Sequence, residues 1–96
     1  MAPSDRQFRS CDVSVHGRVQ GVGFRFLVMR EAEDIGLAGF ARNEPDGSVT
    51  LHLEGLGYQT DRLLTWLRSG DHHFKIRRMY RRPTKPLGLT DFRIIY

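Results

Sequence analysis

The spacing of the hydrophobic residues changes repeatedly along this chain, and it restricts the possible folds more than any other feature. Residues 11–15 and 49–54 alternate between apolar and polar side chains, the period of a strand that buries one face. Residues 24–35 and 60–67 carry apolar side chains at helical spacing. Three further segments predict short strands, at residues 37–43, 74–79 and 92–96.

The segments between these elements have turn and capping chemistry. Gly36 is placed to end the first helix, and Thr60 or Asp61 could cap the second, which is expected to stop near Gly70. The tetrapeptide at residues 44–47 (EPDG) is a turn sequence, so the strands on either side of it form a hairpin. The apolar spacing slips by one residue within 74–79, as at a β-bulge.

This order of elements predicts an α+β, ferredoxin-like split βαβ sandwich. It reads βαββαβ plus a short C-terminal strand, with an antiparallel sheet and both helices on one face. A chain of 96 residues is long enough for one domain. We expect that domain to span residues 8–96, preceded by a flexible N-terminal tail at residues 1–7.

Cysteine content and hydropathy restrict the class of protein. The single cysteine, Cys11, excludes an internal disulfide framework and a cysteine-rich zinc site, and its place in an alternating segment predicts a buried thiol. No apolar stretch approaches the roughly 20 residues that a membrane-spanning helix needs, and the N-terminus has no hydrophobic signal-like segment. We therefore expect a cytoplasmic monomer without a membrane partner.

The net charge of +4 is concentrated in residues 75–85 (KIRRMYRRPTK), which hold six basic residues and no acidic one. On an edge strand, such residues deter edge-to-edge aggregation. The same stretch could also bind phosphate or nucleic acid. The sequence leaves both interpretations open, with the edge strand preferred.

A glycine-rich loop, VHGRVQGVGFR at residues 15–25, joins the first strand to the first helix. It is not a Walker loop, because no lysine follows its glycines, and Phe26 stands where a dinucleotide fingerprint needs its third glycine. The first N–H groups of a helix have no intrahelical acceptor, so they can bind an anion. Arg25 adds a planar fork of donors suited to two phosphate oxygens. The alternative is a tight turn with Arg25 paired to a helix carboxylate.

Two motifs together resemble the acylphosphatase family: residues 15–25, followed by Ala32, and residues 36–49 (GLAGFARNEPDGSV). The resemblance covers roughly residues 9–96. It implies hydrolysis of the carboxyl-phosphate bond of an acyl phosphate, to a carboxylate and inorganic phosphate, without metal or cofactor. It also implies that inorganic phosphate or sulfate would bind as an anion or inhibitor.

The same resemblance implies a role for individual residues. Arg25 would hold the phosphate and Asn43 would position the attacking water. The backbone N–H groups of the loop would complete the phosphate site, at Gln20, Gly21, Val22, Gly23, Phe24 and Arg25.

Two other functions remain possible from the sequence. RNA-recognition motifs share this order of elements, but they stack bases on aromatic residues of the central strands. The outward positions here are Asp12, Ser14 and His16 on the first strand and Thr50, His52 and Glu54 on the third, so nucleic acid is not an expected partner. The fold could also serve as a phosphate-sensing domain with little turnover. His72 and His73 are adjacent and would point to opposite faces of a strand, so no metal site is expected.

Overall fold

The computed structural model describes residues 6–70 and 72–96, so most of the predicted tail at 1–7 lies outside the described residues. The Gln7 carbonyl accepts a hydrogen bond from the Gly57 N–H at 3.0 Å, directly before the first strand. The elements are β1 (Phe8–Arg18), α1 (Phe24–Ile35), β2 (Ala38–Asn43), β3 (Val49–Leu56), α2 (Gly57–Leu67), β4 (Lys75–Pro83) and β5 (Phe92–Ile95). This order confirms the predicted βαββαβ arrangement with an added C-terminal strand.

The five strands form one sheet in the order β4-β1-β3-β2-β5. β1 is antiparallel to β3 and β4, and β2 is antiparallel to β3. β5, however, runs parallel to β2, so the prediction of a wholly antiparallel sheet is wrong for the last strand. The reason is topological: β4 ends at the end of the sheet where β2 begins, and residues 84–91 cross the sheet there to start β5 beside β2.

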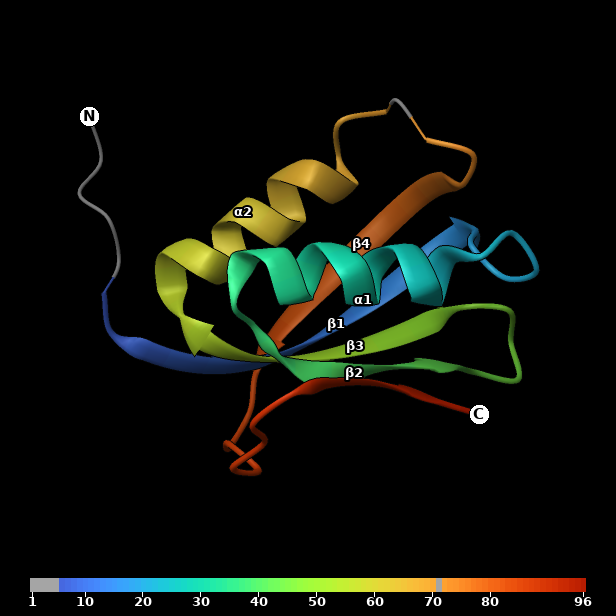
Figure 1. Ribbon diagram of the computed structural model, residues 1–96. Helices are drawn as coiled ribbons and strands as arrows, with labels where there is room; N and C mark the ends of the chain where they lie inside the picture. Colours follow the sequence, from blue (N-terminus) through green and yellow to red (C-terminus); the bar gives the residue numbers. More distant parts are fainter. Residues whose placement is uncertain (1–5, 71) are drawn as a thin grey trace.

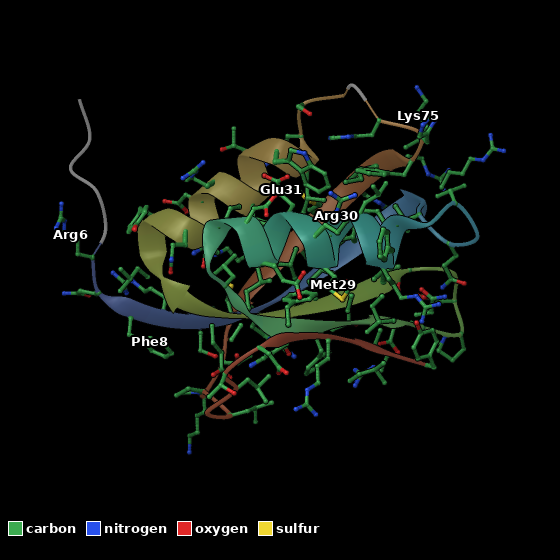
Figure 2. All side chains as sticks on the ribbon, in the orientation of Figure 1. Arg6, Phe8, Met29, Arg30, Glu31 and Lys75 are labelled. Atoms are coloured by element: carbon green, nitrogen blue, oxygen red, sulfur yellow. The ribbon has the colours of Figure 1, made fainter. Side chains whose placement is uncertain are left out.

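Both helices lie on one face of the sheet, as predicted, and the core fills the space between the two layers (Figure 1). Figure 2 shows Met29 of α1 facing the sheet, while Arg30 and Glu31 point away from it. Cys11 is buried, as predicted, and burial raises the pKa of its thiol. The centre of the core comes from β1, α1, β3 and α2: Val13, Val15, Val28, Ala32, Leu51, Leu53, Leu63, Leu64 and Leu67.

The two helices begin and end by different means. Gly36 ends α1 in the left-handed conformation, with φ 99°, and its N–H donates to the Ala32 carbonyl at 2.8 Å, which confirms the predicted stop. α2 begins at Gly57, so the prediction of a cap at Thr60 or Asp61 is wrong. β3 runs directly into the helix, and Gln59 Oε1 accepts the Leu56 N–H at 2.8 Å, the bond that the N3 side chain of a capping box makes to the N-cap backbone.

The sheet face away from the helices is only partly exposed. His52 and Glu54 point to this face, as the alternation predicted, yet only 3% and 2% of their surfaces are exposed. Glu54 accepts hydrogen bonds from backbone N–H groups of residues 87–89, which cover it. These two side chains therefore lie on the outer face, as expected, but they are buried there and not exposed to solvent. β4, which carries most of the basic stretch, is an edge strand of the sheet, as preferred from the sequence.

Candidate active site

Three segments that lie far apart in the sequence meet at one end of the molecule. Figure 1 shows the loop after β1, the turn between β2 and β3 and the C-terminus at the same end. They enclose a cavity of about 170 Å³. A single water needs only about 10–15 Å³ of such space, so the cavity can hold a phosphoryl group and a water. Its lining residues are Val19, Gln20, Gly21, Gly23, Phe24, Arg25, Phe26, Asn43, Ile94 and Tyr96.

The glycines of the loop make its conformation possible. Gly21 and Gly23 have φ values of 75° and 76°, in the left-handed region that side chains disfavour. A Cβ atom at either position would meet nothing within 4 Å, so conformation and not space requires glycine there. The space above these two glycines is open to the cavity, which would let an anion approach the backbone closely.

Gly17, at the start of the same motif, must be glycine for a different reason. A Cβ atom there would lie 2.2 Å from the Lys75 carbonyl oxygen, so close packing of β1 against β4 requires glycine. The register of this strand pair shifts between His16 and Gly17, which confirms the predicted bulge. Gly17 thus shapes the sheet where the loop leaves it, and Gly21 and Gly23 shape the loop itself.

The backbone N–H groups of residues 20–25 are available to a ligand. The first hydrogen bond of α1 runs from the Leu27 N–H to the Gly23 carbonyl at 3.1 Å, so the N–H groups of Phe24 and Arg25 precede the helical ladder. Within residues 6–70 and 72–96, no backbone N–H of the 20–25 loop donates a hydrogen bond to another group of the chain. These donors lie at the positive end of the helix dipole, which favours an anion.

Arg25 is held over the cavity by the C-terminal segment. Its Nη1 donates to the Ile95 carbonyl at 2.9 Å, and its guanidinium carbon lies 5.0 Å from the centre of the Tyr96 ring. The sequence-based alternative, a pairing with a helix carboxylate, is not observed among the described residues. The remaining guanidinium donors are free to bind phosphate oxygens.

Gln20 connects the loop to the turn that follows Asn43. Its Nε2 donates to the carbonyls of Glu44 and Ser48 at 2.9 and 2.8 Å. The turn is closed by the Glu44 N–H, which donates to the Ser48 carbonyl at 2.8 Å. The side chain of Gln20 therefore fixes the distance between the loop and Asn43, a role that its position in the motif does not show.

Asn43 ends β2 at the wall of the cavity. Its Oδ1 is buried and has no hydrogen-bond partner among the described residues. Leaving such an acceptor unsatisfied costs about 1–3 kcal/mol, and most buried polar atoms do have partners. A group with a donor, such as a water held in the cavity, would satisfy it.

The remaining predicted loop residues contribute through their backbone. Only 1% of Phe24 is exposed, and its ring packs edge-on against Phe74 with 4.7 Å between centres. Val22 packs partly against the core and does not line the cavity. Phe26, Ile94 and Tyr96 also line the cavity, and they were not predicted as site residues. The sequence predicted a strand at residues 92–96, but nothing in it indicated that this strand would lie beside β2.

No three His, Cys, Asp or Glu side chains of residues 6–70 and 72–96 are arranged so that they could hold a metal ion. His72 lies in the loop before β4, where its ring stacks on Phe74, 4.4 Å between centres. None of the described helices is long and apolar enough to cross a membrane.

Comparisons with known proteins agree on one family. The family model described as Acylphosphatase matches residues 11–94. An acylphosphatase of Deinococcus radiodurans is 42% identical over 80 residues, 83% of this chain and 92% of the relative. One of a Nocardioides species is 40% identical over 89 residues, 92% of this chain and 90% of the relative. The crystal structure of the Bacillus subtilis acylphosphatase superposes with a TM-score of 0.84 at 32% identity, covering 94% of this chain and all of that one.

Proposed function

The chain belongs to the acylphosphatase family, and on that premise we propose that Arg25 and the 20–25 loop bind the phosphoryl group while Asn43 orients the attacking water. The overall reaction follows from the family: the enzyme is a hydrolase of small-molecule acyl phosphates. The proposal concerns how this chain performs it.

The observation that carries the proposal is the position of Asn43. Its buried Oδ1, which has no partner in residues 6–70 and 72–96, shares one cavity with Arg25 and with the backbone donors of the loop. A water that donates to this oxygen would be held beside a phosphoryl group bound by the loop. Hydrolysis of a phosphoryl bond needs donors that stabilise the negative charge of the phosphoryl group and an acceptor that orients the attacking water. Both kinds of group line this one small cavity.

Phosphoryl transfer explains why so few groups suffice. Its transition state is loose, so positioning and charge stabilisation provide most of the catalysis. The positive charge of Arg25 and the loop N–H groups face the equatorial oxygens, where charge is spread. The leaving group is a carboxylate, which departs without protonation at neutral pH. Asn43 can therefore orient the water without acting as a base, and no metal is required in this scheme.

The experiment that tests this assignment is steady-state hydrolysis of benzoyl phosphate in EDTA by the wild type, Arg25→Ala and Asn43→Ala. We expect Arg25→Ala to raise KM and to lower kcat/KM by about 10²–10³-fold, the cost of one lost transition-state donor. Asn43→Ala should lower kcat by about 10²-fold, with KM little changed, because water positioning is lost. Arg62→Ala, which removes an exposed arginine from α2, is the matched control.

Binding of inorganic phosphate, followed by calorimetry, separates the two roles. It should weaken strongly in Arg25→Ala and hardly at all in Asn43→Ala, and phosphate or sulfate should inhibit competitively. Full turnover in Asn43→Ala would refute the role of that residue. A wild type that binds phosphate but does not hydrolyse acyl phosphates in this assay would instead favour a phosphate-sensing domain.

The proposed enzyme is a cytoplasmic monomer in which residues 8–96 form the working domain. Gel filtration with light scattering tests the monomer, and cell fractionation tests the location. Deletion of residues 1–7 should leave hydrolysis unchanged if they form a flexible tail. Nucleic acid is not a proposed partner, because residues 87–89 cover part of the sheet face on which RNA-recognition motifs stack bases.

A further inference from the structure

Glu54 is a buried carboxylate whose bonds reach the segment that leads into β5. It lies on β3, on the face away from the helices, with 2% of its surface exposed. Its two oxygens accept hydrogen bonds from three consecutive backbone N–H groups: Leu87 at 2.5 Å, Gly88 at 3.2 Å and Leu89 at 3.1 Å. A carboxylate that takes three successive amides fixes that stretch of backbone at one point of the sheet.

His52 completes the arrangement on the same strand. Its Nε2 lies 2.6 Å from Glu54 Oε2 and its Nδ1 lies 2.7 Å from Asp12 Oδ1. The ring stacks on Phe40 with 5.2 Å between centres. A histidine between two carboxylates donates from both nitrogens when protonated, which compensates the buried charge of Glu54 and orients its oxygens.

The anchored segment determines where β5 begins. β5 has four residues and pairs only with β2, in the register Gly39 with Phe92 through Arg42 with Ile95. A shift of two residues would keep the same side chains facing the core, so the alternation alone does not exclude it. Such a shift would move the Ile95 carbonyl by about 6.6 Å, two strand residues. Arg25 would then lose both of its contacts with this segment: the Ile95 carbonyl, which now accepts its Nη1 at 2.9 Å, and the Tyr96 ring, whose centre lies 5.0 Å from its guanidinium carbon.

We propose that Glu54 is a positioning residue for acyl-phosphate hydrolysis. By anchoring residues 87–89 to β3 it sets the register of β5 on β2, and through the Ile95 carbonyl it places the guanidinium of Arg25 in the phosphate site. Glu54 itself does not line the cavity and does not touch the substrate. The inference rests on the proposed role of Arg25 in binding phosphate.

The test is a double-mutant cycle between Glu54 and Arg25, read as phosphate affinity and as KM for benzoyl phosphate. Glu54→Gln keeps the volume of the side chain but replaces one accepting oxygen by an NH₂ donor. That donor would face either the N–H groups of residues 87–89 or the ring of His52, and it can accept from neither. We expect Glu54→Gln and Glu54→Ala to weaken phosphate binding about 5- to 30-fold. In the Glu54→Ala background, Arg25→Ala should cost far less than it does in the wild type, because Arg25 is already displaced. Glu33→Gln, on the exposed surface of α1, is the matched control.

Additive effects of the two substitutions would overturn the inference, because a merely destabilising change at Glu54 would leave the contribution of Arg25 intact. NMR gives a second reading: the Arg25 Nε–Hε signal and the amides of residues 93–96 should shift in Glu54→Gln, and unchanged signals would contradict the proposal. If the Glu54 variants do not fold, Gly88→Ala is the alternative test. It strains the anchored segment at a residue with φ 79° and leaves Glu54 in place. It should weaken phosphate binding in the same direction, and unaltered binding would count against the anchor.

The outcomes also separate this inference from the proposed function. If Arg25→Ala leaves phosphate binding unchanged in the wild-type background, the proposed function fails, and the inference fails with it. If Arg25→Ala weakens binding and the Glu54 variants do not, only the positioning role of Glu54 is wrong.

Discussion

Two stretches of the backbone carry N–H groups on consecutive residues that could surround an anion. They differ in whether those N–H groups already have an acceptor within the protein. The amides of residues 87–89 all donate to the carboxylate of Glu54. The backbone amides of the 20–25 loop donate to no group in the described part of the chain. The stretch that receives its anion from the protein is structural, whereas the stretch left open at a cavity is suited to bind an anion from outside. We call them the filled nest (residues 87–89) and the open nest (residues 20–25).

Both nests depend on glycine in the left-handed conformation. Gly23 in the open nest has φ 76° and Gly88 in the filled nest has φ 79°, and neither would meet another atom if it carried a Cβ. Local geometry is therefore similar in the two places. What differs is the presence of a buried carboxylate on the neighbouring strand, and that difference arises from tertiary structure.

Among variants that leave Arg25, Asn43 and Glu54 intact, the largest effect is expected from closing the open nest with Gly23→Ala. An alanine in the left-handed region destabilises the backbone by about 1–2 kcal/mol. A loop that relaxes to avoid this strain would turn its N–H groups away from the cavity. Phosphate affinity should fall about tenfold, equivalent to about 1.4 kcal/mol, as measured by calorimetry. Gly70→Ala, with φ 79° and open space, imposes the same strain away from the site and should leave affinity unchanged. Equal losses in both variants would contradict the open nest.

Removing the side chain that ties the open nest to Asn43 should have the next largest effect. Gln20→Ala removes two hydrogen bonds, each worth about 0.5–1.5 kcal/mol, so urea unfolding should show a loss of about 1–2 kcal/mol, and kcat should fall several-fold. Gln59→Ala is the matched control, because Gln59 also makes two bonds to backbone groups, at Leu56 and Ile35, away from the cavity. It should lower stability similarly and leave kcat unchanged.

The filled nest makes stability depend on pH on both sides of neutrality. Hydrogen bonds from His52 and from the 87–89 amides outweigh burial and lower the pKa of Glu54 below its ordinary 4.5. Burial of His52 acts in the opposite direction, yet its bonds to Glu54 and Asp12 raise its pKa above 6.5. The contribution of Glu54 is present above pH 4.5 and is lost as the pH falls through its lowered pKa. That of His52 is complete below pH 6.5 and is lost as the pH rises through its raised pKa.

Urea unfolding across this range measures both branches. Glu54→Gln should reduce the alkaline branch, because His52 then keeps only Asp12 of the two carboxylates that raise its pKa. The acid branch should persist in part, since the pKa values of Glu44 and Asp46 are also lowered by hydrogen bonds from Thr50 and Ser48. An alkaline branch of undiminished size in Glu54→Gln would show that His52 is not coupled to the filled nest.

The smallest effect is expected at the rim of the open nest. Tyr96→Ala removes the ring beside the Arg25 guanidinium, a contact worth about 0.5–1 kcal/mol at an exposed site. KM for benzoyl phosphate should rise about two- to fivefold, which is the change in affinity that this contact energy corresponds to. Tyr96→Phe keeps the ring and should behave as the wild type. A rise in KM as large in Tyr96→Phe as in Tyr96→Ala would assign the role to the hydroxyl and refute the ring contact.

Local chemistry made much of the fold predictable. The alternation at residues 11–15, the helical spacing at 24–35 and the turn at 44–47 each depend on neighbours in sequence, and each element was predicted correctly. The start of α2 was not, because Gln59 caps a helix that follows β3 without a loop. The parallel pairing of β5 was also missed, since strand direction depends on how residues 84–91 cross the sheet.

The sequence by itself determined which residues could form a phosphate site: a loop whose glycines allow a left-handed backbone, placed before a helix and followed by Arg25. It did so because backbone conformation and helix-end donors are local properties. Only the tertiary structure decided that Asn43, Ile95 and Tyr96 surround that loop, and that Glu54 is buried instead of exposed. Those positions depend on strand order, on register and on a loop that crosses the sheet, and each of these is set by contacts between segments far apart in the chain.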